Sequence, residues 1–129
     1  EYKLAISVLR EFGTVCELTS ESKFHEFTSV LGSGQAFIFE ILKNYQNKIN
    51  KFSKNSRELN RNFYNFISSV ADAYADKKDL EDLINEIRSP KGTTHAGIIS
   101  LKRDKVKNKI DKAFKAAELR SKEIQNEYK

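Results

Sequence analysis

Hydrophobic residues recur every three or four positions along most of the chain, the spacing that gathers them on one face of an α-helix. This pattern predicts a first helix that ends at Gly13, where a glycine would take the C′ position. A short helix capped by Ser20 or Ser22 follows, and a longer one covers about residues 35–50. Residues 14–18 alternate between polar and apolar side chains but have no partner strand, so an extended connector is predicted there.

The second half of the chain predicts further helices. Asn55 and Glu58 have the spacing of a capping box, which places the start of a long helix at this point. Asp79 begins another helix, and Asp104 is the expected cap of the last one. That final helix would be roughly 36 Å long at about 1.5 Å per residue. Since no internal repeat and no flexible linker is visible, the chain is predicted to be one all-α domain, a helical bundle over residues 1–129.

The segment Gly32-Ser33-Gly34 interrupts the helical pattern. A lone Gly-x-Gly is weak evidence for phosphate binding, because no strand precedes it and no third glycine follows. A tight turn that lets two helices pack closely is the favoured interpretation.

The helix after this turn is apolar nearly all round in its first two turns, at Phe37, Ile38, Phe39, Ile41 and Leu42. Such a helix has to be buried on more than one side, which a small monomer cannot readily provide. The final helix is also longer than the rest of so short a chain can cover. Both features predict a homodimer or a larger assembly of identical chains.

The composition agrees with a folded chain, because 39% of the 129 residues are hydrophobic and nine Phe and five Tyr supply large apolar surfaces. No apolar run is long enough to cross a membrane, so no membrane partner is expected. The single cysteine, Cys16, cannot form an intramolecular disulfide, which favours the cytoplasm, and it is expected to be a small buried hydrophobe. Since the chain has no methionine, and hence no initiator of its own, it is expected to be a piece of a longer product.

A formal net charge of +5 raises the question of a nucleic-acid partner. The densest basic segment, residues 102–112, places its lysines opposite Val106, Ile110 and Ala113 on a predicted helix. A solvated helix face is the favoured interpretation, and a phosphate-binding stripe is the minor alternative. No nucleic-acid partner is therefore expected.

Residues 87–97 form the one segment where a proline, two glycines and several hydroxyl residues lie together between helices. Pro90 cannot continue a helix and moves Ser89 out of the α region, so the preceding helix must stop. Gly92 can adopt a positive φ and lets another group approach the main chain closely, and the two threonines after it would begin a new helix. The unpaired N–H groups and the positive dipole end of such a helix suit an anion, although a capped turn is the simpler interpretation.

No catalytic constellation is recognisable in the sequence. His25 and His95 have no nucleophile or carboxylate at a known spacing, and His25 is expected to be a partly exposed structural residue rather than a metal ligand. No Gly-x-Gly-x-x-Gly follows a strand, so no nicotinamide cofactor is expected to bind this chain. The sequence thus predicts no catalytic, cofactor-binding or metal-ligating residue.

Residues 89–97, Ser-Pro-Lys-Gly-Thr-Thr-His-Ala-Gly, resemble the Ser-Pro-Gly-Gly-Thr-Thr-x-Ala-Gly signature of Δ1-pyrroline-5-carboxylate reductases. Residues 31–37, Leu-Gly-Ser-Gly-Gln-Ala-Phe, are similar to that family's Ser-Gly-Ser-Gly-Pro-Ala-Tyr, and residues 113–121 resemble its closing Ala-rich, Arg-Ser helix. The order of the motifs also agrees, and the likeness covers only the family's C-terminal half. Two positions depart from the pattern: Gln35 replaces a proline, and Lys91 replaces the first glycine.

This resemblance implies an all-helical C-terminal domain that interlocks two subunits and follows an N-terminal Rossmann domain that holds NADPH or NADH. Family members reduce 1-pyrroline-5-carboxylate to L-proline, a step of proline biosynthesis. The chain alone would then bind no cofactor and would be inactive without the cofactor domain. The alternative is a non-catalytic dimerisation module, a truncated or degenerate relative of the reductase.

The same resemblance implies that the loop holds a small carboxylate, the substrate's, at Ser89, Gly92, Thr93 and Thr94. The Thr94 hydroxyl would lie towards the ring nitrogen of the substrate. Lys91 could add charge for the carboxylate or could obstruct the loop, and both interpretations stay open.

Overall fold

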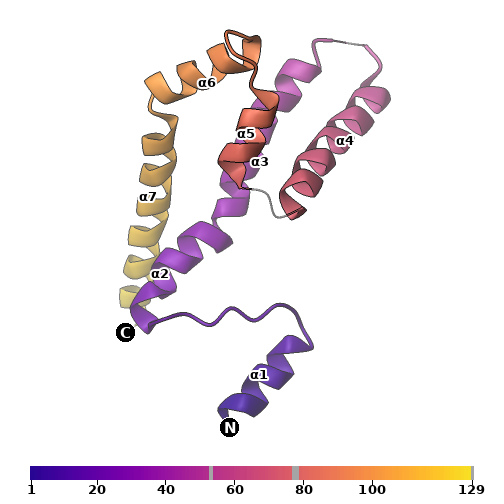
Figure 1. Cartoon of the computed structure of the whole chain (residues 1–129). Coiled ribbons are helices and arrows are strands. Elements are labelled where there is room, and N and C mark those ends of the chain that lie inside the picture. The colour runs from indigo at the N-terminus through magenta and orange to yellow at the C-terminus, as the bar shows by residue number, and fades with distance from the viewer. Residues whose placement is uncertain (53, 77–78, 129) are drawn as a thin grey trace.

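The computed structural model describes residues 1–52, 54–76 and 79–128, and all regular structure within these ranges is helical (Figure 1). In chain order the elements are α1 (Tyr2–Arg10), the 3₁₀ turn η1 (Glu21–Lys23), α2 (Phe24–Phe27), the π-helical turn η2 (Thr28–Gly32), α3 (Gly34–Ile49), α4 (Ser56–Ala75), α5 (Leu80–Ile87), α6 (Thr93–Arg103) and α7 (Val106–Glu127). The expected all-α class is therefore confirmed.

Two helix starts follow directly from local sequence. At the start of α4, Asn55 Oδ1 accepts a hydrogen bond of 3.2 Å from the Glu58 amide. At the start of α5, Asp79 Oδ1 accepts one of 2.8 Å from the Glu81 amide. Each bond satisfies a backbone donor that has no partner inside its helix, a cap that contributes about 1 kcal/mol. The caps predicted at Asn55 and Asp79 are confirmed.

α1 ends earlier than the sequence predicts, and it lies apart from the other helices (Figure 1). Its last residue is Arg10, and the amides of Glu11 and Phe12 donate to carbonyl oxygens three residues back, at 3.2 and 3.1 Å. These tighter bonds close the helix end without a C′ glycine, so the prediction for Gly13, which has no positive φ, is wrong. The extended connector predicted at residues 14–18 is confirmed.

The turn predicted at Gly32-Ser33-Gly34 is wrong, because the chain stays helical there. The Ser33 amide donates to the Thr28 carbonyl oxygen at 3.0 Å, a bond that spans five residues and makes η2 a π-helical turn. Ser33 has right-handed helical backbone angles, and α3 begins at the next residue. The close packing expected of these glycines is confirmed: Gly34 is buried, and a Cβ built on it would lie 3.6 Å from Phe114 Cε1 of α7.

α7 packs along α2 and η2 (Figure 1), and it is contacted by a polar side chain of α2 and an aromatic side chain of α3. His25 of α2 makes hydrogen bonds to Ser121 through Nδ1, at 2.9 Å, and to Gln125 through Nε2, at 3.1 Å. Nearer the middle of α7, the rings of Phe114 and Phe37 lie 5.5 Å apart. His25 is half-buried and holds two helices together, which confirms the structural role expected for it.

α3 and α4 form the second packed pair. The stacked rings of Tyr45 and Phe66 have their centroids 5.8 Å apart, and Phe63 stacks on Phe66 at 6.4 Å. Leu59, only 8% exposed, lies in the first turn and a half of α4. The two pairs diverge along the molecule, and α6 crosses from the end of α5 to the start of α7 (Figure 1).

The start of α7 differs from its prediction. Asp104 ends α6 rather than capping α7, and its carboxylate accepts hydrogen bonds from Ser100 and Arg103 at 3.4 and 3.3 Å. α7 follows Lys105, which adopts the left-handed conformation with φ of 54°. The change of direction is thus made by the lysine, and the cap predicted at Asp104 is wrong. α7 has 22 residues, which corresponds to about 33 Å.

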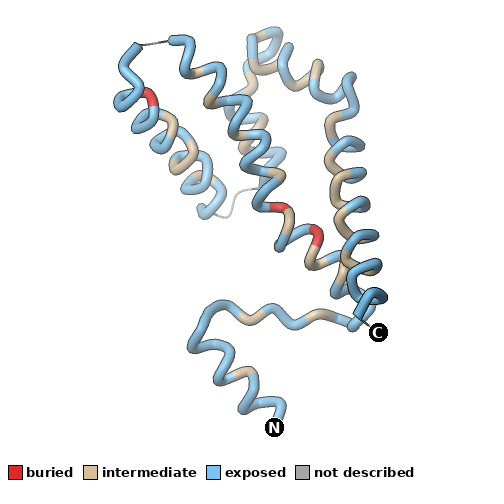
Figure 2. Tube along the Cα trace, turned by 180° about the vertical axis from the view of Figure 1, so that it is seen from behind, coloured by how far each residue is buried: buried red, intermediate tan, exposed pale blue. Residues whose placement is uncertain are grey.

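The single chain has almost no hydrophobic core (Figure 2). Among the described residues only Ser29, Gly34 and Leu59 are buried. Cys16 is exposed on its connector, contrary to the prediction. Large apolar side chains are exposed on every helix from α3 to α7, among them Ile38, Phe39, Ile41, Tyr45, Tyr64, Phe66, Val70, Tyr74, Leu80, Ile87, Ile99, Leu101, Leu119 and Ile124. Since burying one such side chain contributes about 1.5–3 kcal/mol, these helices lack most of the stabilisation that a second surface would supply.

Among the described residues, Glu118 of α7 has the most strongly shifted pKa. Its carboxylate accepts hydrogen bonds from Lys122 at 2.6 Å and from Lys115 at 3.0 Å, and the side chain is 17% exposed. These two bonds, Lys122 first, lower the pKa of Glu118 from 4.5 to about 2. A carboxylate whose pKa is lowered by folding stabilises the folded state above its unfolded pKa, and this contribution is lost as the pH falls towards the folded pKa.

We expect Glu118→Gln to reduce the loss of stability that acid causes between about pH 4.5 and about pH 2. The measurement is the free energy of unfolding at neutral pH and at several values within that window. Glu123→Gln is the matched control, because Glu123 pairs with Arg120 at 3.1 Å but is 63% exposed. The assignment is contradicted if the two variants show the same acid sensitivity as the unchanged chain.

Candidate functional site

The loop between α5 and α6 contains a β-turn over residues 89–92. The Gly92 amide donates to the Ser89 carbonyl oxygen at 3.1 Å, and Pro90 and Lys91 are the two central residues. Lys91 has a φ of 59°, the positive value that the third residue of a type II turn requires. Glycine is usual at that position because a Cβ there meets the backbone. The sequence predicted that Gly92 can adopt a positive φ. The structure places the positive φ one residue earlier, at Lys91.

Gly92 has a different role in the turn. Its φ of −78° and ψ of 177° are accessible to any residue. A Cβ built on Gly92, however, would collide with Ser89 Oγ and would lie 3.2 Å from the Ser89 carbonyl oxygen. Glycine is therefore favoured here, because the Ser89 side chain lies directly against the backbone of Gly92 and would have to move for any larger residue. The close approach that the sequence predicted at Gly92 is confirmed.

α6 begins immediately after this turn, with Gly92 as its N-cap residue. The first intrahelical bond is the one from the Ala96 amide to the Gly92 carbonyl oxygen, at 3.1 Å, so the amides of Thr93, Thr94 and His95 precede it. No side chain caps this end, and no acidic residue lies in the first turn. Free amides and the positive end of the helix dipole together favour an anion at this position.

The hydroxyl groups of the loop are available as well. Within the part of the chain that the structure describes, the side chains of Ser89, Thr93 and Thr94 make no hydrogen bond. Thr94 is half-buried, whereas Ser89 and Thr93 are exposed. The structure therefore brings all four predicted residues, including Gly92, into one turn and the first turn of one helix.

The positive charge next to this loop comes from Lys91, whose side chain is exposed. On the other side of the turn, Arg88 donates a hydrogen bond of 2.7 Å from its guanidinium to Asn85 Oδ1 of α5. Part of the hydrogen-bonding capacity of this guanidinium is therefore occupied. Across the described ranges no group of three or more His, Cys, Asp or Glu residues could hold a metal ion. The chemistry that this arrangement offers is recognition of a small anion by amides, hydroxyls and one lysine.

We expect Lys91→Gly to leave the free energy of unfolding unchanged or to raise it by up to about 1 kcal/mol. The left-handed conformation costs a residue with a Cβ about 1–2 kcal/mol, and glycine relieves this strain. Glycine also gives the unfolded chain more freedom, which costs about 0.5–1 kcal/mol and offsets part of the relief. Chemical denaturation measures the difference. Lys102→Gly, inside α6, is the control and should lower stability by about 1 kcal/mol. Equal losses in both variants would show that Lys91 is not strained.

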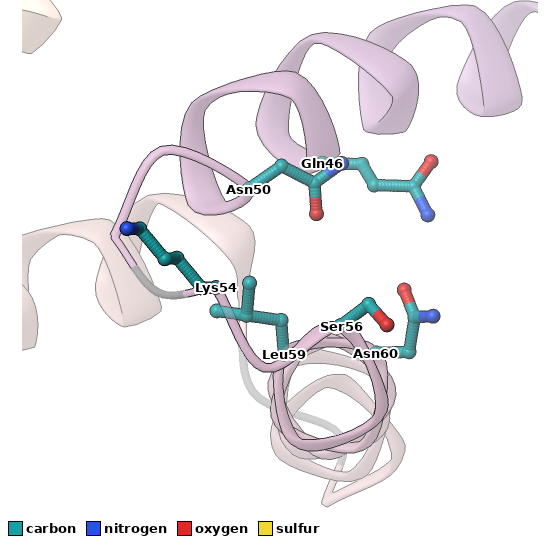
Figure 3. A pocket seen from close by; sticks show the side chains of 6 residues that line it. All are labelled: Gln46, Asn50, Lys54, Ser56, Leu59 and Asn60. Atoms are coloured by element: carbon teal, nitrogen blue, oxygen red, sulfur yellow. The ribbon is translucent and has the colours of Figure 1, made fainter.

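A hollow lies between the end of α3 and the start of α4 (Figure 3). It has a volume of about 450 Å³ and is lined by Gln46, Asn50, Lys54, Ser56, Leu59 and Asn60. Figure 3 shows the amides of Gln46 and Asn60 on facing helices, with Leu59 on the α4 side. No signal in the sequence indicates this hollow, because its polar residues belong to no motif and meet only when α3 and α4 pack. Its described lining has one basic side chain, Lys54, and no carboxylate or histidine that could activate the Ser56 hydroxyl.

The described parts of the chain thus define a class of protein: a helical domain with an incomplete core and an anion-compatible loop. No helix among the described residues has the length and apolar character needed to cross a membrane. The family model for pyrroline-5-carboxylate reductase dimerisation matches residues 21–124. The chain belongs to this family, as the resemblance of its motifs predicted.

Curated relatives and solved structures agree with this assignment. The chain is 28% identical over 121 residues to a pyrroline-5-carboxylate reductase of Staphylococcus aureus, which covers 92% of the chain and 44% of that protein. The chain is 27% identical over 119 residues to a pyrroline-5-carboxylate reductase of Staphylococcus epidermidis. A pyrroline-5-carboxylate reductase structure from Coxiella burnetii superposes with a TM-score of 0.80 at 26% identity, over 95% of this chain and 46% of that one.

A pyrroline carboxylate reductase structure from Plasmodium falciparum, which has NADP bound, shares the fold with a TM-score of 0.77 at 22% identity. The matched region covers 94% of this chain and 46% of the Plasmodium falciparum chain. The chain therefore spans less than half the length of the relatives that it matches. It corresponds to the dimerisation half of such proteins.

Proposed function

We propose that this chain is the dimerisation and substrate-carboxylate-binding part of an oxidoreductase that reduces 1-pyrroline-5-carboxylate to L-proline with NADPH or NADH. Its membership of the dimerisation family and the names of its relatives support the reaction class. Because the chain spans 44% of such a relative, the cofactor would be held by residues outside the sequence considered. The chain alone is then inactive and binds no nicotinamide cofactor.

The homodimer is supported by the uncovered apolar surface of the single chain. Phe39 is 66% exposed on α3, Tyr64 is 70% exposed on α4, and Ile87 is 71% exposed at the end of α5. A surface of this kind on several helices matches obligate interfaces, which resemble a protein core cut in half. The second copy would complete the core that one chain lacks.

One observation supports the proposed substrate site most directly. Three hydroxyls without a partner and the amides at the start of α6 lie together in the turn that Ser89 and Gly92 form. A planar carboxylate can accept hydrogen bonds from several such donors, and the helix dipole adds up to about 1 kcal/mol. Ser89, Gly92, Thr93 and Thr94 would bind the substrate carboxylate, and the Thr94 hydroxyl would approach the ring nitrogen.

Reduction of the cyclic imine places a hydride on carbon and a proton on nitrogen, and the nicotinamide supplies the hydride when it is bound. The residues of this chain would act by binding and orientation. By fixing the carboxylate, the loop would set the position of the ring relative to the cofactor domain. The Thr94 hydroxyl would accept or donate a hydrogen bond at the ring nitrogen.

A non-catalytic dimerisation module is the second candidate. Lys91 stands where the family motif has glycine, and Gln35 stands where it has proline. Lys91→Gly separates the two roles open to this lysine in a proline-binding measurement. Weaker binding of the variant favours charge assistance and hence the reductase, whereas tighter binding favours an obstructed loop and hence the module.

The experiment that tests the proposed site is proline binding by Thr94→Val, measured by calorimetry or NMR titration. The valine keeps the shape of the side chain and removes one hydroxyl, so binding should weaken by about 1–2 kcal/mol. Thr19→Val is the matched control, because Thr19 lies on the exposed connector before η1. Unchanged affinity in Thr94→Val, or an equal loss in both variants, contradicts the proposed site.

A further inference from the structure

The two histidines of the chain have different surroundings. Both ring nitrogens of His25 are hydrogen-bonded, to Ser121 at 2.9 Å and to Gln125 at 3.1 Å. The ring of His95 makes no hydrogen bond, ion pair or ring contact with any described residue, although the residue is half-buried. A half-buried imidazole gives up part of its contact with water, which costs free energy unless a partner replaces the water. His95 therefore has room for a partner that the single chain does not supply.

His95 is the third residue of α6, after the N-cap residue Gly92. A side chain at the third position of a helix can reach back to the N-cap residue, as a glutamate does in a capping box. The amide of Gly92, which such a side chain would otherwise bind, already donates to the Ser89 carbonyl oxygen at 3.1 Å. The imidazole of His95 can therefore reach the end of α6 where the carboxylate is proposed to bind, and its own partner there is not the backbone.

Few charged groups surround this end of α6. The first turn contains no acidic residue. On the side of α5 and the turn the charged residues are Arg88, Lys91 and Glu86, and Glu86 already has an interaction of its own. α7 meets α6 at its opposite end (Figure 1), about 10 Å or more along the axis from His95, and the charged residues at that junction are Lys102, Arg103, Asp104 and Lys105.

These surroundings couple the charge of the ring to an anion. The positive end of the helix dipole and the charge of Lys91 oppose a positive charge on His95 as long as no anion is bound. A carboxylate at the start of α6 removes this opposition and can accept a charge-assisted hydrogen bond from the imidazolium. Binding of the carboxylate and protonation of the ring therefore favour each other.

We propose that the imidazolium of His95 donates a hydrogen bond to the bound carboxylate, so that His95 is a further binding residue of the site and makes its affinity depend on pH. This inference rests on the proposed carboxylate site. The affinity is highest where the ring is protonated, and it falls as the pH rises through the range of about pH 5 to about pH 8 in which histidine ordinarily changes charge. The hydroxyl of Thr94 stays free for the ring nitrogen of the substrate.

NMR titration of the full chain with L-proline at several pH values and constant ionic strength tests the inference. Proline should bind about three to ten times more tightly at about pH 5.5 than at about pH 8. Its carboxylate and its secondary amine keep their charges between these values, so the change belongs to the protein. Proline should also move the pH titration of the His95 Hε1 signal to higher pH. The His25 signal is the internal control and should not move, because both nitrogens of that ring are bonded within the chain.

Two substitutions separate the charge of His95 from its shape. His95→Gln keeps a hydrogen-bonding side chain suited to the third position of a helix but has no charge. It should bind proline as the unchanged chain does at about pH 8, with no gain at about pH 5.5. His95→Lys carries its charge throughout this range and should bind tightly at both values. Cyclopentanecarboxylate, which has the ring and the carboxylate but no nitrogen, should show the same pH dependence as proline with the unchanged chain.

The inference is overturned if proline shifts the amides of Gly92, Thr93 and Thr94 equally well at every pH, or if His95→Gln keeps the full pH dependence. The proposed carboxylate site would survive both results. A pH dependence seen with proline but not with cyclopentanecarboxylate would assign the contact to the substrate nitrogen and would also overturn the inference. Absence of proline binding at every pH would contradict the proposed site itself, and the role of His95 would fall with it.

Discussion

Phe39→Glu should convert the dimer into a monomer at micromolar concentration. The ring is 66% exposed in the single chain, on the part of α3 that is apolar nearly all round. Removing its burial forfeits about 1.5–3 kcal/mol, and burying an unpaired carboxylate among apolar side chains costs more. A loss of about 2.7 kcal/mol already weakens a dimer 100-fold. Sedimentation velocity across a concentration series measures the change.

Lys43→Glu is the control for this variant. It introduces the same side chain one turn further along α3, at an exposed position that pairs with Glu40 at 3.4 Å. This variant should remain a dimer. If Phe39→Glu also remains a dimer at low micromolar concentration, then α3 does not lie in the interface and the proposed completion of the core is wrong.

Gly92→Val should abolish proline binding. The new side chain would collide with Ser89 Oγ and press on the Ser89 carbonyl oxygen, which is 3.2 Å from the Cβ position. The serine must then leave its place against the backbone, and the turn that aligns the amides of α6 is distorted. We expect at least a tenfold loss of affinity, which corresponds to about 1.4 kcal/mol.

Gly97→Val tests whether a bulky residue in α6 is harmful in itself. A Cβ on Gly97 meets nothing within 4 Å in the single chain. We expect this variant to bind proline as the unchanged chain does. Retained binding in Gly92→Val, measured beside this control, would contradict the role given to the turn.

Features decided within a few residues could be predicted from the sequence. Asn55 and Asp79 cap their helices because a short polar side chain before an amphipathic run can reach a nearby amide. Pro90 keeps Ser89 out of the α region for an equally local reason, and α5 has already ended, with Arg88 extended. The four residues predicted for the carboxylate lie together for the same reason, since six positions of one loop contain them all.

Features decided by packing could not be predicted. Gly32-Ser33-Gly34 looked like a turn, but the small side chains let α3 approach α7, and the extra residue is absorbed in a π-helical bond. The positive φ belongs to Lys91 rather than to Gly92, because the position of a residue within a type II turn outweighs its own preference. Cys16 was expected to be buried, yet one chain has no core to cover it.

The most direct test of the central claim is an amide chemical-shift map of the dimer during titration with L-proline. The proposed function predicts that the largest shifts occur at the amides of Gly92, Thr93 and Thr94, with the apolar interface unchanged. Weak binding is expected, because the chain corresponds to less than half of its relatives. Shifts confined to other helices, or none at millimolar proline, would contradict a carboxylate site at the start of α6.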